Sequence, residues 1–262
     1  GSTTKSFTIS KVTPTITWAS PSSITYGTAL SDTQLNASTG VAGSFAYVAP
    51  SATPASGTVL PAGAHLLTAS FTPTDTTNYN NASKSVSITV NKATPVITWA
   101  SPDAITEGDA LSGTQLNAST GVSGSFTYAV ATATPAAGVI LPVGTHTLNA
   151  SFAPSDTANY TNASASVQIT VNQLVAQVSW PSPDPIEYGV ALSADELNAT
   201  ANVPGKFVYA APSATPAFNI ILPVGTHTLT VTFTPTNLAK FSVVTKTVQI
   251  TVTKSSPFVD WP

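Results

Sequence analysis

The sequence has no cysteine, no methionine and no arginine, and only 7% of its 262 residues are charged, against about 25% in an average globular protein. Without cysteine there can be no disulfide, no thiolate metal site and no cysteine nucleophile. With eight lysines and a net charge of −3, the chain offers no basic patch for a phosphate backbone. Nucleic acid is therefore not an expected partner.

Long apolar segments are also missing. No run approaches the roughly 18 apolar residues that a membrane-spanning helix needs, so no membrane insertion is predicted. A low charge content accompanies disorder only where hydrophobicity is low as well. Here 42% of the residues are hydrophobic and they recur at regular positions, which favours a packed β protein with a hydroxyl-rich surface.

The chain does contain an internal repeat. Trp18, Trp99, Trp180 and Trp261 follow one another at intervals of 81 residues, and the copies align without a gap. That period exceeds the roughly 20–50 residues of a solenoid unit and suits a small independent domain. We therefore predict three tandem domains, spanning residues 11–91, 92–172 and 173–253.

The flanking residues continue the same pattern. Residues 1–10 begin with Gly1-Ser2, which we interpret as a cloning scar, and then match the last strand of a preceding repeat. Residues 254–262 match the first strand of a following repeat. Almost no linker separates the copies, and a short junction that runs into a proline restricts bending. The arrangement predicts an extended, semi-rigid rod.

Alternation of apolar and polar residues predicts the strands. In the first copy it occurs around residues 15–18, 35–38, 44–47, 65–71 and 85–90. Clusters of Pro, Gly, Ser and Asp between these segments indicate turns, and no stretch has useful helical periodicity. Six or seven short strands of this kind predict an all-β fold of two packed sheets.

Several motifs of each copy resemble one known family. In the first copy they are Ile-Thr-Tyr-Gly-x-Ala-Leu (Ile24 to Leu30), Gly-x-Phe-x-Tyr (Gly43 to Tyr47), Leu-Pro-Ala-Gly-x-His-x-Leu-x-Ala-x-Phe (Leu60 to Phe71) and Pro-Thr-Asp-x-x-Asn-Tyr (Pro73 to Tyr79). These motifs resemble bacterial immunoglobulin-like (Big or MBG type) repeat domains of large secreted or surface proteins. The resemblance covers nearly the whole chain and implies immunoglobulin-like β-sandwiches that serve as spacers, stalks or adhesive modules. The third copy departs from the last motif, because residues 237–241 read Asn-Leu-Ala-Lys-Phe.

One histidine recurs in each copy, at His65, His146 and His227. A single histidine per copy is a poor metal set, and the strand alternation places it on the side of the following Leu and Ala. We interpret each as a partly buried side chain that is hydrogen-bonded to backbone, rather than as a ligand or a catalyst. No Gly-x-Ser-x-Gly motif occurs, so a serine nucleophile is not predicted either.

The loop carboxylates raise the question of calcium. Asp75 with Asn78, and Asp156 with Asn159, supply one carboxylate per loop. Ca²⁺ takes six to eight oxygen ligands, and several carboxylates usually contribute to them. An Asx-turn that fixes the loop is the favoured interpretation. A second candidate is a junction site that uses Asp103 and Glu107, or Asp184 and Glu187, which has no counterpart in the first copy.

Three further features invite a functional interpretation. Exposed tryptophans would suit sugar stacking, but Trp18 shares a face with Ile16, so burial in the core or at a junction is favoured. The Asn-x-Ser triplets at Asn36 and Asn117 are interpreted as solvent-facing positions in a chain rich in these residues. An isopeptide bond from Lys11 or Lys92 is rejected because the third copy has Gln173 there.

The sequence thus predicts a non-catalytic spacer or stalk module, with no catalytic, cofactor-binding or metal-binding residue. The expected location is extracellular or at a bacterial cell surface, and the expected partners are neighbouring repeats of the same chain in a monomeric protein. The alternative is an adhesive or carbohydrate-binding array with a surface glycan or protein as partner. The solvent exposure of Trp18, Trp99 and Trp180 distinguishes the two functions.

Overall fold

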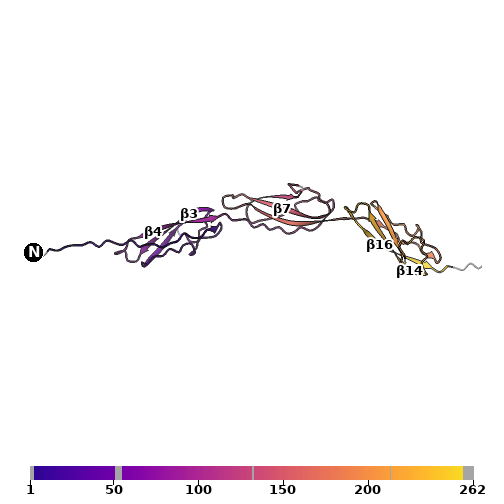
Figure 1. The fold of residues 1–262 in the computed structure, drawn as a ribbon, viewed down its shortest axis with the longest axis horizontal. Coiled ribbons are helices and arrows are strands. Elements are labelled where there is room, and N and C mark those ends of the chain that lie inside the picture. The colour runs from indigo at the N-terminus through magenta and orange to yellow at the C-terminus, as the bar shows by residue number, and fades with distance from the viewer. Residues whose placement is uncertain (1–2, 51–54, 132, 213, 256–262) are drawn as a thin grey trace, which may run out of the picture. The chain divides into compact units, whose positions relative to one another are not determined.

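The computed structural model describes residues 3–50, 55–131, 133–212 and 214–255. Within these ranges the chain forms strands, turns and bridges, and it has no helix that is long and apolar enough to cross a membrane (Figure 1). Gly1-Ser2 and residues 256–262, which include Trp261, lie outside the described residues. The predicted all-β class is confirmed.

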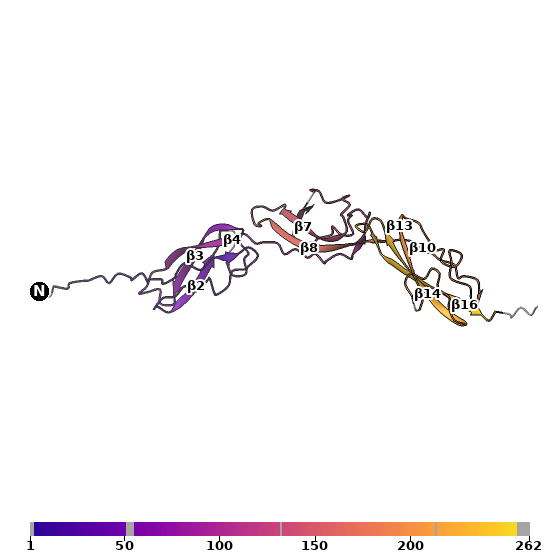
Figure 2. The same cartoon turned by 45° about the vertical axis from the view of Figure 1, so that its right-hand side comes forward.

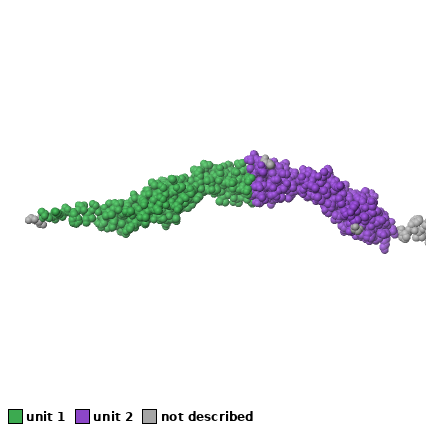
Figure 3. All heavy atoms as spheres, viewed as in Figure 1, with its two compact units in different colours: residues 1–100, 118–128, 149–166 green, residues 101–117, 129–148, 167–262 purple. Residues whose placement is uncertain are grey.

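The chain divides into two compact units (Figure 3). The first comprises residues 1–100, 118–128 and 149–166, and the second comprises residues 101–117, 129–148 and 167–262. The division falls within the second repeat and not at an 81-residue boundary. The three domain boundaries therefore stay a prediction, and the word repeat below refers to the sequence copies.

The first repeat contains one four-stranded sheet. Its strands are β1 (Ile24–Thr25), β2 (Gly43–Val48), β3 (Gly63–Pro73) and β4 (Ala82–Asn91), in the order β1-β4-β3-β2. The long strands β3 and β4 pair antiparallel, and β2 lies on the other side of β3 (Figure 2). The short strand β1 pairs parallel to β4. A hairpin of the last two strands beside an earlier strand is the arrangement of the C, F and G strands in an immunoglobulin fold.

The other two repeats form a sheet of the same strand order, and their strands begin at equivalent positions of the repeat. In the second repeat the order is β5 (Ile105–Thr106), β8 (Ala163–Asn172), β7 (Gly144–Pro154) and β6 (Gly124–Val130). In the third it is β11 (Ile186–Glu187), β16 (Val244–Thr253), β14 (Gly225–Pro235) and β13 (Gly205–Ala210). The immunoglobulin-like fold class predicted from the sequence is confirmed by these strand orders.

The layer that covers each sheet is less regular than predicted. The segments expected to be strands at 15–18 and 35–38 are joined by one bridge, Thr17 to Ser38. In the third repeat the equivalent residues form a short pair, β10 (Val178–Ser179) and β12 (Thr200–Ala201), and β9 (Leu174–Val175) pairs with β15 (Phe241–Ser242). Turn residues interrupt these segments too often for longer ladders.

The core lies between the sheet and this covering layer. Along β3 every second residue from Leu67 to Phe71 is fully buried, as the alternation predicts, and the same holds for the last half of β4. Covering residues such as Trp18 and Leu35 close the core from the other side. The third repeat has an equivalent core.

The residues before the first repeat behave differently. Residues 3–10 form no strand, and Phe7 and Ile9 are 85% and 79% exposed. Their match to the last strand of a repeat, and that of residues 254–262 to a first strand, stay predictions.

Candidate functional site

The loop between β3 and β4 is organised by its carboxylate. In the first repeat Asp75 Oδ1 accepts hydrogen bonds from the backbone amides of Thr77 and Asn78, at 3.0 and 3.1 Å. The Asn78 side-chain amide donates to Asp75 Oδ2 at 2.8 Å, and this bond holds the pKa of Asp75 below its ordinary value. The predicted Asx-turn is confirmed, and both carboxylate oxygens have donors within the loop.

The second repeat has the same loop in a different setting. Asp156 Oδ2 again accepts from the Asn159 side-chain amide at 2.8 Å, which lowers the pKa of Asp156. Unlike Asn78, which is exposed, Asn159 is half-buried, because residues of the first repeat lie against it. The side-chain oxygen of Asn159 accepts a hydrogen bond from the backbone amide of Ala62 at 2.8 Å. All of these residues belong to the first compact unit.

The amide of Ala62 is presented by a turn that precedes β3. Gly63 in this turn has a φ of 133°, a backbone conformation that glycine adopts without strain. His65, two residues on, is half-buried and its Nε2 lies 2.7 Å from the carbonyl oxygen of Pro61. The histidine thus closes the turn from one side while the Ala62 amide points to the next repeat.

His146 and His227 make the same contact with Pro142 and Pro223, at 2.7 and 2.6 Å. The predicted half-buried, backbone-bonded histidine is confirmed in all three copies. In each case Nε2 contacts the carbonyl oxygen four residues earlier in the chain. This contact gives the histidine a structural role in the Pro-x-Gly turn.

An aromatic contact lies beside the hydrogen bond from Ala62. Tyr26 of the first repeat and Tyr160 of the second meet edge to face, with ring centroids 5.3 Å apart and an interplanar angle of 84°. Edge-to-face pairs of this geometry are favourable beyond the area that they bury. We call the four residues Tyr26, Ala62, Asn159 and Tyr160 the junction contact.

A single residue links the two repeats at this point. Asn91 is the last residue of β4 and pairs with Thr25, while Ala93 already bridges to Tyr160 in the second repeat. The linking residue, Lys92, donates from its ammonium group to the carbonyl oxygen of Thr157 at 2.7 Å. The side chain of Lys92 is therefore hydrogen-bonded to the second repeat, and the residues on both sides of Lys92 are paired by their backbones.

The junction between the second and third repeats has the same short linker and different side chains. Asn172 ends β8 and Leu174 begins β9, so that Gln173 alone links them. Glu107 stands at the position of Tyr26, and Lys240 stands at the position of Asn159. Lys240 has no side-chain oxygen, and among the described residues nothing accepts a hydrogen bond from the amide of Val143, the counterpart of Ala62.

Two of the tryptophans are core residues. Trp18 and Trp180 are only 4% and 3% exposed, and Trp99 is half-buried. Each indole meets a tyrosine edge to face, with centroids about 5.4–5.5 Å apart, and the partners are Tyr47, Tyr128 and Tyr209. The predicted burial is confirmed for Trp18 and Trp180, while Trp261 lies outside the described residues.

The hydroxyl groups of these tyrosines are sheltered. Burial raises the pKa of Tyr47, Tyr128 and Tyr209 above the ordinary tyrosine value. In the third repeat the Tyr209 oxygen accepts a hydrogen bond from the backbone amide of Ala199 at 2.9 Å. In the first repeat the Tyr47 hydroxyl instead donates to the Ala37 carbonyl at 3.5 Å, the outer limit of such a bond.

The remaining candidate residues, the junction carboxylates and the Asn-x-Ser triplets, do not form a common site among the described residues. In the described part of the chain, no three His, Asp or Glu residues lie close enough together to hold a metal ion. Asp103 is exposed, and Glu107 contributes its backbone amide to Asn172. Asn36 and Asn117 are exposed, as predicted, and their side-chain amides donate to backbone carbonyls three residues earlier.

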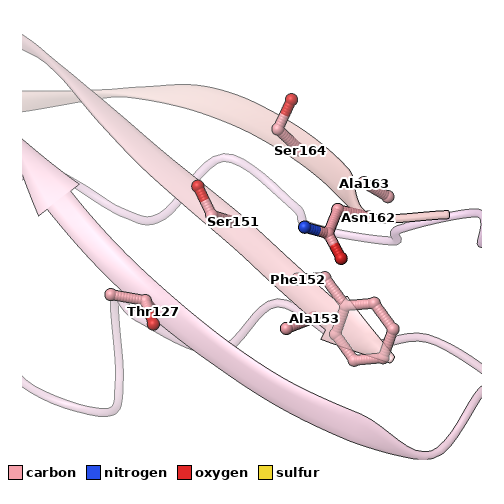
Figure 4. Close-up of a pocket in the computed structure, with 7 residues that line it drawn as sticks. All are labelled: Thr127, Ser151, Phe152, Ala153, Asn162, Ala163 and Ser164. Atoms are coloured by element: carbon pink, nitrogen blue, oxygen red, sulfur yellow. The ribbon is translucent and has the colours of Figure 1, made fainter. Parts of the chain in front are cut away.

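A hollow of about 320 Å³ lies on the second repeat, over the ends of β6, β7 and β8 (Figure 4). Its lining residues are small or neutral and include one buried aromatic ring: Thr127, Ser151, Phe152, Ala153, Asn162, Ala163 and Ser164. No titratable side chain lines it. The hollow therefore offers hydroxyl and amide groups but no acid, base or nucleophile of lowered pKa.

Comparison with known proteins adds little to these contacts. No protein-family model and no curated protein matches the chain. Among solved structures it is similar to Drosophila N-cadherin EC1-4, with 10% identity and a TM-score of 0.28 over 92% of this chain and 73% of that one. It is similar to Sidekick-1 immunoglobulin domains 1–5, with 10% identity and a TM-score of 0.28 over 92% and 59%. For the fibronectin(III)-like modules of Clostridium thermocellum CbhA the values are 16% and 0.22 over 61% and 95%. With TM-scores this low, the fold assignment rests on the strand order.

Sequence reasoning missed the junction contact. It assigned Asn78 and Asn159 to their own loops, which is correct, but gave Asn159 no partner in the first repeat. A signal was present: the second copy replaces Tyr26 by Glu107, and the third copy replaces Asn159 and Tyr160 by Lys240 and Phe241. These departures meet at the same junction.

Proposed function

We propose that the chain is a non-catalytic spacer or stalk segment of a secreted or surface-exposed bacterial protein. The observation that carries the proposal is the one-residue linker at each junction, Lys92 and Gln173. Both neighbours of each linker are hydrogen-bonded into a repeat. A linker of this kind has little freedom to bend, whereas a flexible connection needs several unpaired residues.

The strand directions also suit a load-bearing role. In the first repeat the early strand β1 runs parallel to the last strand β4, with Ile24 opposite Val90. Tension applied at the two ends of a repeat pulls such strands past each other, so that their hydrogen bonds are loaded together and not one at a time. β11 and β16 pair in the same way in the third repeat.

The extracellular bacterial setting is supported by the motifs of the first copy, from Ile24 to Tyr79, which resemble those of bacterial immunoglobulin-like repeat domains. The non-catalytic role is supported by the histidines, whose Nε2 atoms are occupied by backbone carbonyl oxygens. The carbohydrate-binding alternative loses two of its three candidates, because buried Trp18 and Trp180 present no ring face for a sugar to stack on.

Small-angle scattering of the full chain tests the proposal. With strands of up to about ten residues at ~3.3 Å per residue, a repeat is roughly 35–40 Å long, so we expect a maximum dimension of about 100–120 Å. A compact particle would contradict the spacer role. A matched pair of insertions sharpens the experiment: six Gly/Ser residues after Lys92 should broaden the distance distribution. The same insertion after Gly40, in an exposed turn, should leave it unchanged.

A further inference from the structure

We propose that the Asp-x-x-Asn-Tyr loop is a docking site for the end of the preceding repeat, and that its residues decide which junctions of the chain are locked. The occupant is the Pro-x-Gly turn together with the tyrosine at the position of Tyr26. The docking is independent of the spacer role, because it concerns only the contacts between neighbouring repeats and not the function of the array.

The occupied copy shows how the site works. Asn159 uses its side-chain amide to hold Asp156, at 2.8 Å, and this leaves the side-chain oxygen free to face the first repeat. That oxygen accepts from the Ala62 amide at 2.8 Å, and the neighbouring Tyr160 ring receives Tyr26. The Asx-turn therefore orients an acceptor, and the turn closed by His65 orients the donor.

An open copy of the same site exists in the first repeat. Asp75, Asn78 and Tyr79 have the same internal hydrogen bonds, but Asn78 is exposed and, among the described residues, nothing donates to its side-chain oxygen. In the third repeat the complementary half is exposed as far as the described residues show: Tyr188 is 52% exposed and Val224, in the Pro-x-Gly turn, is 48% exposed. Under this proposal, the end of a repeat placed directly before Lys11 would occupy the open loop of Asp75, Asn78 and Tyr79.

The third repeat lacks the site. Asn237 replaces the aspartate, Lys240 replaces the asparagine, and Phe241 replaces the tyrosine. On the facing repeat Glu107 replaces the tyrosine that would dock. Both the loop and the docking tyrosine have therefore changed at the second junction. At the outer ends of the three repeats both are retained, the loop at Asp75 to Tyr79 and the tyrosine at Tyr188. The second junction therefore has its one-residue linker, whose Gln173 side-chain amide donates to the Leu238 carbonyl oxygen, without the docking contact of the first junction.

Amide hydrogen exchange of the full chain, followed by NMR, tests the proposal residue by residue. In the unmodified chain we expect the Ala62 amide to exchange about tenfold more slowly than that of Val143, as one hydrogen bond would produce. Asn159→Ala should remove this protection, while the matched variant Asn78→Ala should leave it intact. Equal exchange at Ala62 and Val143 in the unmodified chain, or unchanged protection in Asn159→Ala, would overturn the proposal.

Transfer of the site provides the converse test. The fourfold variant Glu107→Tyr, Asn237→Asp, Lys240→Asn and Phe241→Tyr gives the second junction the tyrosine and the Asp-x-x-Asn-Tyr loop of the first. We expect the Val143 amide to become about tenfold slower to exchange. Slow amides in β14 check that the third repeat remains folded; with those retained, unaltered exchange at Val143 would overturn the proposal.

The open copy is tested by adding a repeat. A further copy of residues 11–91 joined directly before Lys11 places a tyrosine and a Pro-Ala-Gly turn against Asn78. We expect the added alanine amide to be protected like that of Ala62, and Asn78→Ala to abolish the protection. Exchange as fast as at Val143 would show that the loop does not dock a preceding repeat.

Discussion

Gly43 illustrates how tightly single residues are specified in the repeated sheet. A Cβ atom at this position would lie 2.3 Å from the backbone oxygen of Thr72 and 2.5 Å from the Phe71 ring. The ring of Phe71 therefore lies over the glycine of the neighbouring strand, where any side chain would collide with it. Gly124 and Gly205 have the same relation to Phe152 and Phe233, so the glycine of the Gly-x-Phe-x-Tyr motif is required by packing.

We expect Gly43→Ala to lower the free energy of unfolding of the first repeat by about 1–3 kcal/mol, since the added methyl group forces the Phe71 ring and the β2–β3 backbone apart. Exchange rates of the β3 amides, which report the opening of this repeat alone, measure the effect. Gly40→Ala is the matched control, because a Cβ there meets nothing within 4 Å. A loss of stability of the same size in both variants would contradict this explanation.

At the scale of the elements, a tyrosine hydroxyl joins each sheet to its covering layer. Tyr209 on β13 accepts a hydrogen bond from the amide of Ala199, a buried residue beside β12. In the first repeat the equivalent Tyr47 only donates, at 3.5 Å, to the carbonyl oxygen of Ala37. The same residue type therefore serves the third repeat as a necessary partner and the first as a weak one.

Tyr209→Phe should destabilise the third repeat by about 1–3 kcal/mol, because the Ala199 amide would be left buried without an acceptor. Tyr47→Phe should cost the first repeat less than about 1 kcal/mol, because its bond is long and a carbonyl oxygen tolerates the loss better. Amide exchange in β14 and in β3 measures the two values. The explanation fails if the two substitutions cost the same.

The long strands were predictable from the sequence and the short ones were not. The alternation at residues 44–47, 65–71 and 85–90 is long enough to indicate strands and lies within β2, β3 and β4, which extend beyond it at both ends. β1 has two residues, and Ile24 pairs with Val90, 66 positions later in the chain, so no local pattern marks this strand. The covering segments have the predicted inward residues, but their turns prevent regular ladders.

The site was predictable only in its local part. The Asx-turn of Asp75 follows from residues three positions apart, and the histidine contact follows from strand parity. The pairing of Tyr26 with Tyr160 joins residues in different repeats, which no local rule connects. It becomes visible only when departures on the two sides of one junction are compared, as at Glu107 and Lys240.

At the scale of the whole molecule, the hydrogen bonds of the loop carboxylates predict that calcium does not change the stability of the chain. Asp75 and Asp156 accept hydrogen bonds from their own loops, so that a cation would have to displace donors already in place. We expect the melting temperature of the full chain to be unchanged by EDTA and by millimolar Ca²⁺. A rise with Ca²⁺ that EDTA reverses would show that these loops, or the junction carboxylates near Asp103, bind the ion.

The one-residue linkers also determine how such a protein can change during evolution. Because Lys92 and Gln173 are flanked on both sides by paired residues, there is no spare chain at a boundary to absorb a small insertion or deletion. The length of the chain can then change only by duplication or loss of an entire repeat. The number of repeats therefore sets the distance between the parts of the protein that the array connects.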